Sequence, residues 1–358
     1  MNAQTEIAMT ASVTSADLLK ALGRVKTVIE RRNTIPVLGM VKVAIHDGHC
    51  AIAGTNIDMW ASAGCEGEGS VRFLIQPRLL EHMLRHGGPT IQIVQGADRV
   101  EVHSGDLAGR FNLLCPVEDW LEAGQGTFSK PVSIDAEVLR RAFEAVTPAI
   151  STEETRYYLN GSYFEATDDG LRVVATDGHR LALYDIDGQD WPFPGVIVPR
   201  QAVAWLKREL KGQTQVEVRH DADRNRLRFT AEGWFFETKL IDGNYPDYRR
   251  VIPKPDGTIS VAVSGDALAA LPVIEPHMTP VVKINPEKGR MSVTSVSTGE
   301  VYIPVTGKGP AFGLNAFYLR QFCPRGEAVR IDGTAARDPM LIIGADAALT
   351  RVLMPYHI

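Results

Sequence analysis

Hydrophobic positions along the chain follow two patterns, and each pattern is typical of one kind of element. Short runs with a hydrophobic residue at every second position predict antiparallel strands, joined by turns of Gly, Asp and Asn; examples are VKVAIHDGHCAIAGT, LRVVATDGHRLALYDI and RLRFTAEGWFFETKL. Other segments place hydrophobic residues three and four positions apart, which predicts amphipathic helices. The pattern therefore predicts an α+β fold in which helices cover one face of antiparallel sheet.

One strand-to-helix pattern occurs three times, as SVTSADLLKAL, VSIDAEVLRRAF and VAVSGDALAAL. Aligning Leu19, Leu139 and Leu268 gives spacings of 120 and 129 residues. A second set of helix starts, marked by Pro77, Pro199 and Asn315, is spaced by 122 and 116 residues. Proline suits the start of a helix because its fixed φ is helical and its missing N–H is not needed there. Two markers with nearly the same period predict three copies of one unit, each with two helices on antiparallel sheet.

Hydrophilic breaks between the copies predict where the domains meet. One break is the Gly-rich stretch from Glu122 to Ser129, and the other is PKPDG, residues 253–257. We therefore expect three domains of ordinary size, residues 1–125, 126–255 and 256–358. Gene duplication alone would also produce such repetition, so function has to be argued from motifs.

Composition limits the classes of protein. Hydrophobic residues make up 44% and charged residues 23%, as in soluble globular proteins. There is no membrane-length apolar run and no secretory signal pattern, so we expect a cytoplasmic protein. Cys50, Cys65, Cys115 and Cys323 lack metal-ligand spacing, and neither a metal, a cofactor nor a disulfide framework is expected. The net charge of −5 argues weakly against nucleic-acid binding unless basic residues gather on one face.

The middle copy contains four motifs that together resemble the middle domain of the β sliding clamp of bacterial DNA polymerase III. They are RYYLNG (156–161), ATDGHRLAL (175–183), VIVPR (196–200) and GNYPDYRRVIP (243–253). NTIPVLG (33–39) and VLMP (352–355) resemble landmarks of the first and third domains, so the resemblance covers essentially the whole chain.

The resemblance implies a DNA-clamp fold and a non-enzymatic function. Two chains would form a head-to-tail homodimer, a six-domain ring with helices lining the hole and the first and third domains pairing strand to strand. Such a ring encircles duplex DNA and is the processivity factor of the replicative DNA polymerase.

Helices that face DNA should be basic, because neutralising phosphates releases counterions whatever the base sequence. Five of the six expected helices carry Lys or Arg, although a solvated face is the simpler explanation for any one of them. The first helix of the third copy has no basic residue and is cut by Pro272, whereas the resemblance implies a longer helix there. We expect the following residues near DNA: Arg24, Lys26, Arg32, Arg78, Arg85, Arg140, Arg141, Arg200, Lys207, Arg208, Lys211 and Arg320, with Tyr157 and Tyr158 either stacking on bases or packing in their own hairpin.

The resemblance also implies a cleft on the middle domain, near the third, for a short extended peptide. Its partners would be the polymerase subunit, the clamp loader and other proteins with clamp-binding motifs. Hydrophobic residues there can bury a partner's Leu or Phe, and Arg180 and Arg250 can hold its acidic or amide groups. Carried over motif by motif, the lining is Leu159, Thr176, Gly178, His179, Arg180, Leu181, Pro246, Arg250, Val251, Val352, Met354, Pro355 and Tyr356.

Two features qualify this cleft. The ending Tyr356, His357, Ile358 departs from the family's usual Met, Arg and Leu, which predicts a changed partner preference. Taken alone, TDGH is also typical of an ordinary turn, because Asp177 and Gly178 form a favoured turn pair.

Two other classes of protein stay open. An enzyme could use Asp177, His179 and Asp247 as a metal or acid–base cluster, although the sequence has no P-loop, HExxH, nucleophile elbow or dinucleotide fingerprint. A clamp-fold paralogue that no longer encircles DNA, acting as a regulator or decoy, would explain the bare helix and the changed C-terminus. The enzyme predicts an activity that His179→Ala abolishes, and the decoy predicts a persistent monomer.

Overall fold

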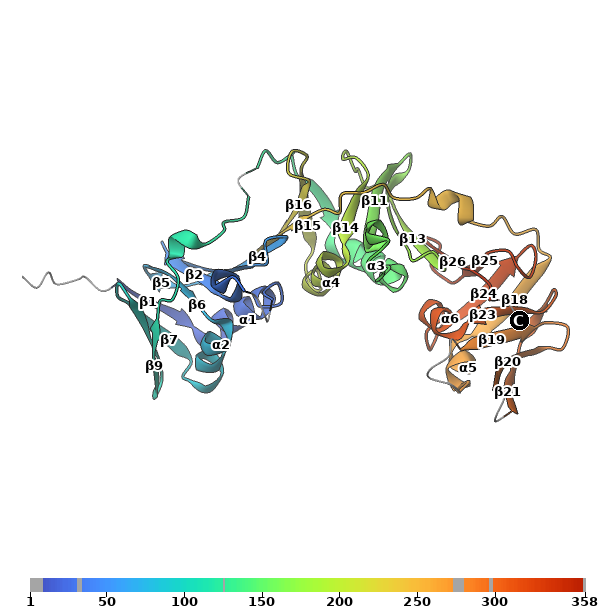
Figure 1. The fold of residues 1–358 in the computed structure, drawn as a ribbon, viewed down its shortest axis with the longest axis horizontal. Helices are drawn as coiled ribbons and strands as arrows, with labels where there is room; N and C mark the ends of the chain where they lie inside the picture. The colour runs from blue at the N-terminus through green and yellow to red at the C-terminus, as the bar shows by residue number, and fades with distance from the viewer. Residues whose placement is uncertain (1–8, 31–33, 125, 273–279, 296–298, 357–358) are drawn as a thin grey trace, which may run out of the picture. The chain divides into compact units, whose positions relative to one another are not determined.

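The computed structural model describes residues 9–30, 34–124, 126–272, 280–295 and 299–356. Within them one order of elements occurs three times: strand, helix, three strands, strand, helix, three strands (Figure 1). Two short strands, β5 (Glu68–Gly69) and β22 (Thr306–Lys308), are additions to the first and third copies. The predicted α+β fold with a threefold repeat is confirmed.

The three copies consist of equivalent elements. The first has β1 (Met9–Thr14), α1 (Ser15–Val25), β2 (Val41–His46), β3 (His49–Thr55), β4 (Met59–Glu66), β6 (Val71–Ile75), α2 (Pro77–His86), β7 (Thr90–Gln95), β8 (Arg99–Ser104) and β9 (Leu107–Asn112). The second has β10 (Val132–Asp135), α3 (Ala136–Val146), β11 (Gly161–Thr167), β12 (Gly170–Thr176), β13 (Arg180–Asp187), β14 (Val196–Pro199), α4 (Arg200–Glu209), β15 (Gln215–Asp221), β16 (Arg226–Ala231) and β17 (Trp234–Lys239). The third has β18 (Ile259–Ser264), α5 (Gly265–Ala270), β19 (Val281–Asn285), β20 (Arg290–Ser295), β21 (Gly299–Pro304), β23 (Phe312–Asn315), α6 (Ala316–Phe322), β24 (Ala328–Gly333), β25 (Met340–Ile343) and β26 (Leu349–Leu353). Short 3-10 helices follow α1 and lie in the connections: η1 (Pro36–Gly39), η2 (Val117–Asp119), η3 (Thr147–Ala149), η4 (Tyr157–Leu159) and η5 (Tyr248–Val251).

Each copy contributes two half-sheets, and neighbouring copies share a sheet. The strand order β10-β15-β16-β17-β4-β3-β2-β6 joins a half-sheet of the second copy to one of the first. The order β14-β11-β12-β13-β26-β25-β24-β18 joins the second and third copies in the same way, with β22 added at its end. Both seams are antiparallel, β4 with β17 and β13 with β26. The remaining half-sheets, β1-β7-β8-β9 and β23-β19-β20-β21, belong to separate sheets.

The chain divides into two compact units that cut across the copies. The first unit combines Met1–Ala136 with Arg208–Leu240, and the second combines Glu137–Lys207 with Ile241–Ile358. In the first unit α1 packs on α2, β3 and β4 (Figure 1). In the second unit α6 packs on α5, β23 and β26. Each seam between copies therefore lies inside one unit.

Equivalent helices bury equivalent residues, which corrects the sequence alignment by one position. The helices α1, α3 and α5 begin at Ser15, Ala136 and Gly265. The fourth residue of each is a fully buried leucine: Leu18, Leu139 and Leu268. Leu19, used in the sequence alignment, is only half-buried because it lies one position round the helix from the core face.

The first helix of the third copy is short, as its proline predicts. α5 has six residues and ends at Ala270, after which Leu271 is extended, with φ −67° and ψ 132°. The residue before a proline disfavours the helical region, so Pro272 accounts for this ending. Arg320 of α6 donates from Nη2 to the carbonyls of Leu268 and Leu271, and so satisfies the end of α5.

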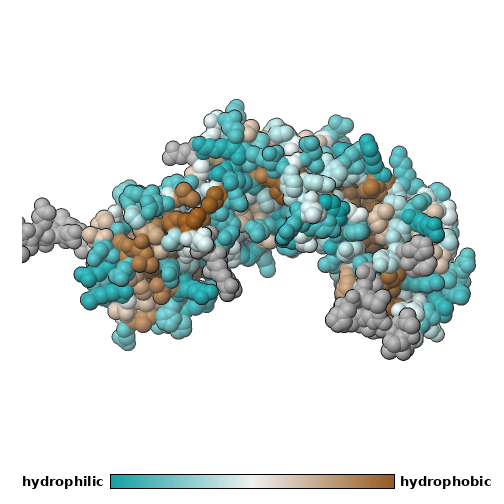
Figure 2. Space-filling model, viewed as in Figure 1, coloured by the Kyte–Doolittle hydropathy of each residue, from teal (hydrophilic) through white to brown (hydrophobic). Residues whose placement is uncertain are grey.

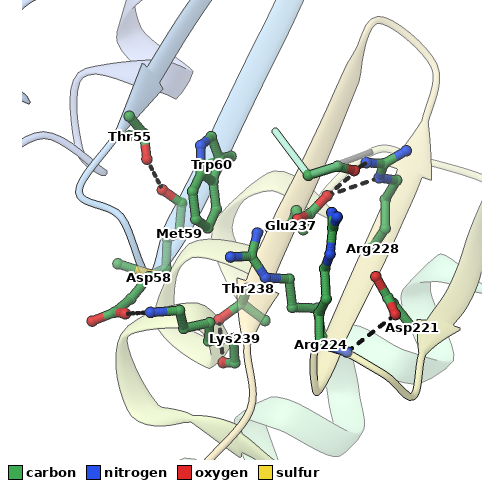
Figure 3. A network of polar contacts seen from close by, with 12 residues as sticks. Thr55, Asp58, Met59, Trp60, Asp221, Arg224, Arg228, Glu237, Thr238 and Lys239 are labelled. Carbon is green, nitrogen blue, oxygen red and sulfur yellow. Dashed lines mark hydrogen bonds and ion pairs between the residues drawn. The ribbon is translucent and has the colours of Figure 1, made fainter. Parts of the chain in front are cut away.

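The seam between β4 and β17 is held by packed aromatic and charged side chains (Figure 3). Glu237 of β17 is fully buried and accepts hydrogen bonds from Arg228, at 2.6 Å, and Arg226, at 2.7 Å. The Arg226 guanidinium also lies over the ring of Trp60 on β4, 4.2 Å from its centroid. Trp60 Nε1 in turn donates to the Leu121 carbonyl at 3.1 Å. This network ties the two strands to the segment that follows the first copy.

Candidate functional site

The residues expected near DNA fall into two groups, and the first is exposed without an ion pair to another described residue. Arg78 on α2, Arg141 on α3, Arg200 at the start of α4 and Lys211 just after α4 belong to it. Lys207, also on α4, is half-buried. These five positive charges are available to a polyanion without breaking a salt bridge that the structure contains. Arg32 lies outside the described residues.

The second group is already paired with carboxylates. Arg24 pairs with Glu209 at 3.1 Å, and Arg208 binds the same residue at 2.5 Å. Lys26 and Arg85 share Glu81, each at 2.7 Å. A phosphate would have to compete with these acids, so this group offers less to DNA than its number of charges suggests.

Arg140 and Arg320 are the most strongly engaged. Arg140 pairs with both Glu137 and Glu144, and the hydrogen bond to Glu137 is the main reason that the Arg140 pKa rises above its usual range. The guanidinium of Arg320 is directed at the end of α5. As DNA contacts, both side chains would first have to leave these partners.

Tyr157 and Tyr158 form an edge-on pair in η4, with ring centroids 5.8 Å apart. Tyr157 is 54% exposed, whereas Tyr158 is half-buried and lies near Gly243. Tyr157 is thus the more accessible of the two rings, although both lie beside Gly243, and stacking on bases stays a prediction.

The TDGH hairpin is an ordered turn built by its own side chains. Asp177 Oδ1 accepts from the backbone N–H groups of His179, at 2.9 Å, and Arg180, at 3.0 Å. Thr176 Oγ1 donates to the Arg180 carbonyl at 2.7 Å, and Gly178 takes a φ of +88°, which favours glycine. The turn chemistry expected from Asp177 and Gly178 is present, and the Asp177 side chain caps the turn.

Several of the predicted cleft residues, Leu181, His179, Val352 and Met354, meet at the seam between β13 and β26. Leu181 pairs directly with Val352, and both are buried in a cluster with Val174, Leu183 and Tyr248. The Met354 N–H donates to the His179 carbonyl at 2.9 Å, which extends the pairing past the end of β26. The seam therefore brings residues some 170 positions apart in sequence into one hydrophobic floor.

Apolar side chains remain exposed around this floor. Val251 is 40%, Met354 39% and Tyr356 47% exposed, while Leu159 is buried. The Tyr356 N–H donates to the Gly313 carbonyl at 2.7 Å, which fixes the changed C-terminus against β23. Pro246 is exposed, Pro355 is half-buried, and Arg250 is largely exposed beside Asp247 at 2.9 Å. Exposed apolar groups together with an exposed arginine can recognise a peptide with hydrophobic and acidic residues.

Arg180 is less available to a partner peptide than the sequence predicts, because its guanidinium already contacts three side chains. It pairs with Asp177 at 2.9 Å, lies over the Tyr318 ring at 4.0 Å and donates to Gln321. Tyr318 and Gln321 on α6 were missed by the motif comparison. Only the contact across 141 residues of sequence identifies them, because α6 itself shows an ordinary amphipathic pattern.

A buried polar layer supports the floor from the side of β11. Tyr163 and Tyr245 stack with centroids 4.7 Å apart, and burial raises the pKa of Tyr245 above its usual range. The Tyr248 hydroxyl donates to Glu165 at 2.6 Å, and burial and this bond raise the pKa of Tyr248 to about 12. These tyrosines are neutral at physiological pH, so they shape the floor without adding charge.

Two specific features, a metal-binding cluster and a membrane-spanning helix, are not found among the described residues. No three His, Cys, Asp or Glu side chains there are grouped so that they could hold a metal ion. Among the helices that the structure describes, none is long and apolar enough to cross a membrane. Figure 2 shows hydrophobic residues at the surface of the first copy, at the left of the view.

Known proteins resemble the chain over almost its whole length. The family model for the N-terminal domain of the DNA polymerase III beta subunit matches residues 9–120, and the model for its central domain matches residues 133–247. The beta sliding clamp of Caulobacter vibrioides strain NA1000 is 33% identical over 98% of this chain and 100% of its own length. That of Escherichia coli K12 is 33% identical over 67% of each chain.

Solved structures agree with these sequence relatives. A crystal structure of the Caulobacter crescentus beta sliding clamp with polyethylene glycol bound has a TM-score of 0.89 and 30% identity, covering 98% of this chain and 99% of that one. The sliding clamp of Bartonella birtlesii bound to griselimycin has a TM-score of 0.90 and 28% identity, with coverage of 98% and 100%.

Proposed function

Because this chain belongs to the family of the DNA polymerase III beta subunit, the β sliding clamps, we propose that it is the sliding clamp of a replicative DNA polymerase. Two copies close head to tail around duplex DNA in the cytoplasm and hold polymerases on it without catalysing a reaction. The three domains are residues 1–125, 126–255 and 256–358, and the two matched family models fall inside the first two. Enclosure retains the DNA, and attraction to its phosphates is secondary.

The arrangement of half-sheets is the observation that carries this proposal. At both seams the last strand of one copy pairs with the third strand after the first helix of the preceding copy, β17 with β4 and β26 with β13. By the same rule β9 and β21 are left as the edges of their sheets in the described residues. In a dimer, β9 of each chain would pair with β21 of the other chain. The same strand pairing would then repeat at every junction and close the two chains into a ring.

Both edges carry apolar groups that a partner would cover. On β21, Val301 is 44% and Tyr302 is 60% exposed. Beside β9, a hollow of about 210 Å³ is lined by Met40, Leu79, Phe111 and Leu114 among others, and Leu114 is 67% exposed. Exposed apolar edge strands promote pairing with another chain, which suits a dimer interface.

The test of ring closure compares two aspartate substitutions in the full chain. Tyr302→Asp places a charge in the proposed interface and should convert the dimer to a monomer that is not retained on circular DNA. Leu121→Asp, at a side chain that is 44% exposed and belongs to neither β9 nor β21, should leave the dimer intact. Mass in solution, from light scattering, and retention on circular against linearised DNA are the readouts. A wild-type chain that stays monomeric at every concentration would overturn the proposal and favour the decoy.

Partners are tethered through the floor and rim at the β13–β26 seam. Met354→Asp should weaken binding of a hydrophobic clamp-binding peptide by about tenfold or more, equivalent to ~1.4 kcal/mol, because a charge replaces a buried thioether contact. Calorimetry measures the affinity, and light scattering checks that the dimer persists. Unchanged peptide affinity in this variant would show that the peptide binds elsewhere.

A further inference from the structure

Cys50 and Cys65 are direct cross-strand partners in the β3–β4 hairpin of the first copy. The Asn56 N–H donates to the Met59 carbonyl directly opposite, at 3.2 Å, which fixes the alternation of the ladder. Counting six residues back along β3 from Asn56 places the cysteines in another hydrogen-bonded pair. Cα atoms in such pairs lie about 5.5 Å apart, inside the range of about 4.4–6.8 Å that a disulfide spans. Their Cβ atoms, up to about 5.5 Å apart, would have to approach to about 4.5 Å or less, so the bond forms with a local adjustment of the two strands.

The two thiols also face each other. Cys50 donates its S–H to Cys65, and this hydrogen bond lowers the pKa of the Cys65 thiol and raises that of Cys50. Burial raises the Cys50 pKa further, because Cys50 is only 1% exposed. Both cysteines are reduced. Deprotonation is therefore easier at Cys65 than at Cys50.

Access to the pair is one-sided. Cys50 is closed in by Gly67, whose ideal Cβ would lie 2.9 Å from that of Cys50, with Val13 and Ile45 beside it. Cys65 is half-buried and more exposed than Cys50, so a reagent from solvent reaches Cys65 first. The other cysteines differ: Cys115 has no cross-strand cysteine, and buried Cys323 has a pKa raised to about 11 by burial. Cys65 is thus positioned to react first, and Cys50 to resolve the product.

We propose that Cys50 and Cys65 form a peroxide-responsive thiol pair, with Cys65 as the attacking and Cys50 as the resolving residue. The Cys65 thiolate attacks one oxygen of a hydroperoxide, the O–O bond breaks, and Cys65 becomes a sulfenic acid as water or an alcohol leaves with the proton. The Cys50 sulfur then attacks the Cys65 sulfur, the S–O bond breaks, and a second water leaves with the Cys50 proton. Two electrons pass from the thiols to the peroxide, and the disulfide joins β3 to β4.

Hydrogen peroxide on the full-length protein tests the proposal. Two of the four thiols should be lost, and cleavage at Asp58, which lies between the cysteines, should leave two fragments joined until a reductant is added. Cys50→Ser should instead accumulate a Cys65 sulfenic acid that dimedone traps. Cys65→Ser should slow oxidation of Cys50 by at least tenfold, whereas Cys115→Ser should form the crosslink at the wild-type rate.

The remaining outcomes overturn the proposal. They are loss of Cys115 before Cys65, an unchanged Cys50 rate in Cys65→Ser, or a stable Cys65 sulfenic acid in the wild-type chain. Because Cys65 is only half-buried, the Cys65→Ser chain is expected to fold, and its unchanged thermal unfolding midpoint checks this.

Discussion

Glu237 is the buried charge on which the seam between the first two copies depends. It has no exposed surface, and its two partners, Arg226 and Arg228, are themselves mostly covered. A buried carboxylate loses its hydration, so it is stable only while both guanidiniums surround it. Removing the carboxylate would leave the two guanidinium groups without a counterion, next to the Gly-rich stretch at Gly124.

Glu237→Ala should lower the free energy of unfolding of this unit by about 3 kcal/mol, because an ion cluster is broken rather than replaced. Glu122→Ala removes an exposed acid paired with Lys42 and Arg72, and should cost less than about 1 kcal/mol. Urea unfolding of both variants measures the difference. Equal losses would show that burial adds nothing to the Glu237 network.

His220 predicts a pH dependence of stability. It is 7% exposed, and burial lowers its pKa below the usual 6.5 despite the nearby Asp221. As the pH drops through about 6.5, the unfolded chain binds a proton at His220 more readily than the folded chain does. The free energy of unfolding is therefore unaffected by His220 above this pH and falls as the pH drops below it. His220→Asn should flatten the slope by up to ~1.4 kcal/mol per pH unit. His46→Asn, at an exposed side chain, should keep the wild-type slope in urea titrations from pH 7 to 5.

At this scale the sequence predicts local chemistry better than partners. Asp177 and Gly178 predict a turn because their effects are local. Asp177 accepts hydrogen bonds from backbone N–H groups two and three residues on, and Gly178 has no side chain to oppose a positive φ. The surroundings of Arg180 were not predictable, since Tyr318 and Gln321 belong to another copy. The partners of Arg320 were not predictable either: they belong to the same copy but lie 52 and 49 residues away in sequence. The partner of a charged side chain depends on which residues the fold brings next to it, and a local sequence pattern does not contain this information.

Helix boundaries follow residues that can be identified in the sequence. Pro77 is the first residue of α2, Pro199 directly precedes α4, and Asn315 caps α6. Pro272 accounts for the early end of α5, and this was expected. The position of the repeat within the first copy was wrong by one residue, because Leu18 and Leu19 are equally hydrophobic and only packing distinguishes them.

Asn315 should contribute measurably to the stability of α6. Its side chain accepts from the N–H groups of Phe317, at 2.9 Å, and Tyr318, at 3.3 Å. Asn315→Ala removes both bonds and should cost about 1 kcal/mol. Asn315→Asp keeps the acceptor oxygens and should restore most of this loss. Thermal unfolding compares the two, and equal midpoints would mean that the cap is dispensable.

For the whole molecule, the net charge of −5 says less than where free positive charges lie. Many of the basic side chains expected near DNA are paired with nearby carboxylates, including Arg24, Lys26 and Arg140. Arg200 and Lys211 are exposed without an ion pair to another described residue. Under the proposed function a modest attraction to phosphates suffices, because the closed ring retains the DNA.

Replacing Arg200 and Lys211 by Glu should therefore weaken DNA binding and reduce the slope of log affinity against log salt by about 2, one for each lost phosphate contact. Arg140→Glu should change that slope less, since its charge is already balanced by two acids. Binding to linear duplex DNA over a series of salt concentrations supplies the slopes. An unaltered slope in the double variant would place these side chains away from the phosphates.

The complementary ends of the chain, β9 and β21, have a genetic consequence under the proposed dimer. A subunit damaged at one end still has a sound opposite end, with which it can engage a healthy subunit. The mixed dimer then has one intact interface and one open interface. In a cell that makes both versions, each defective subunit disables a normal one as well, so a mutation confined to one end should behave as dominant.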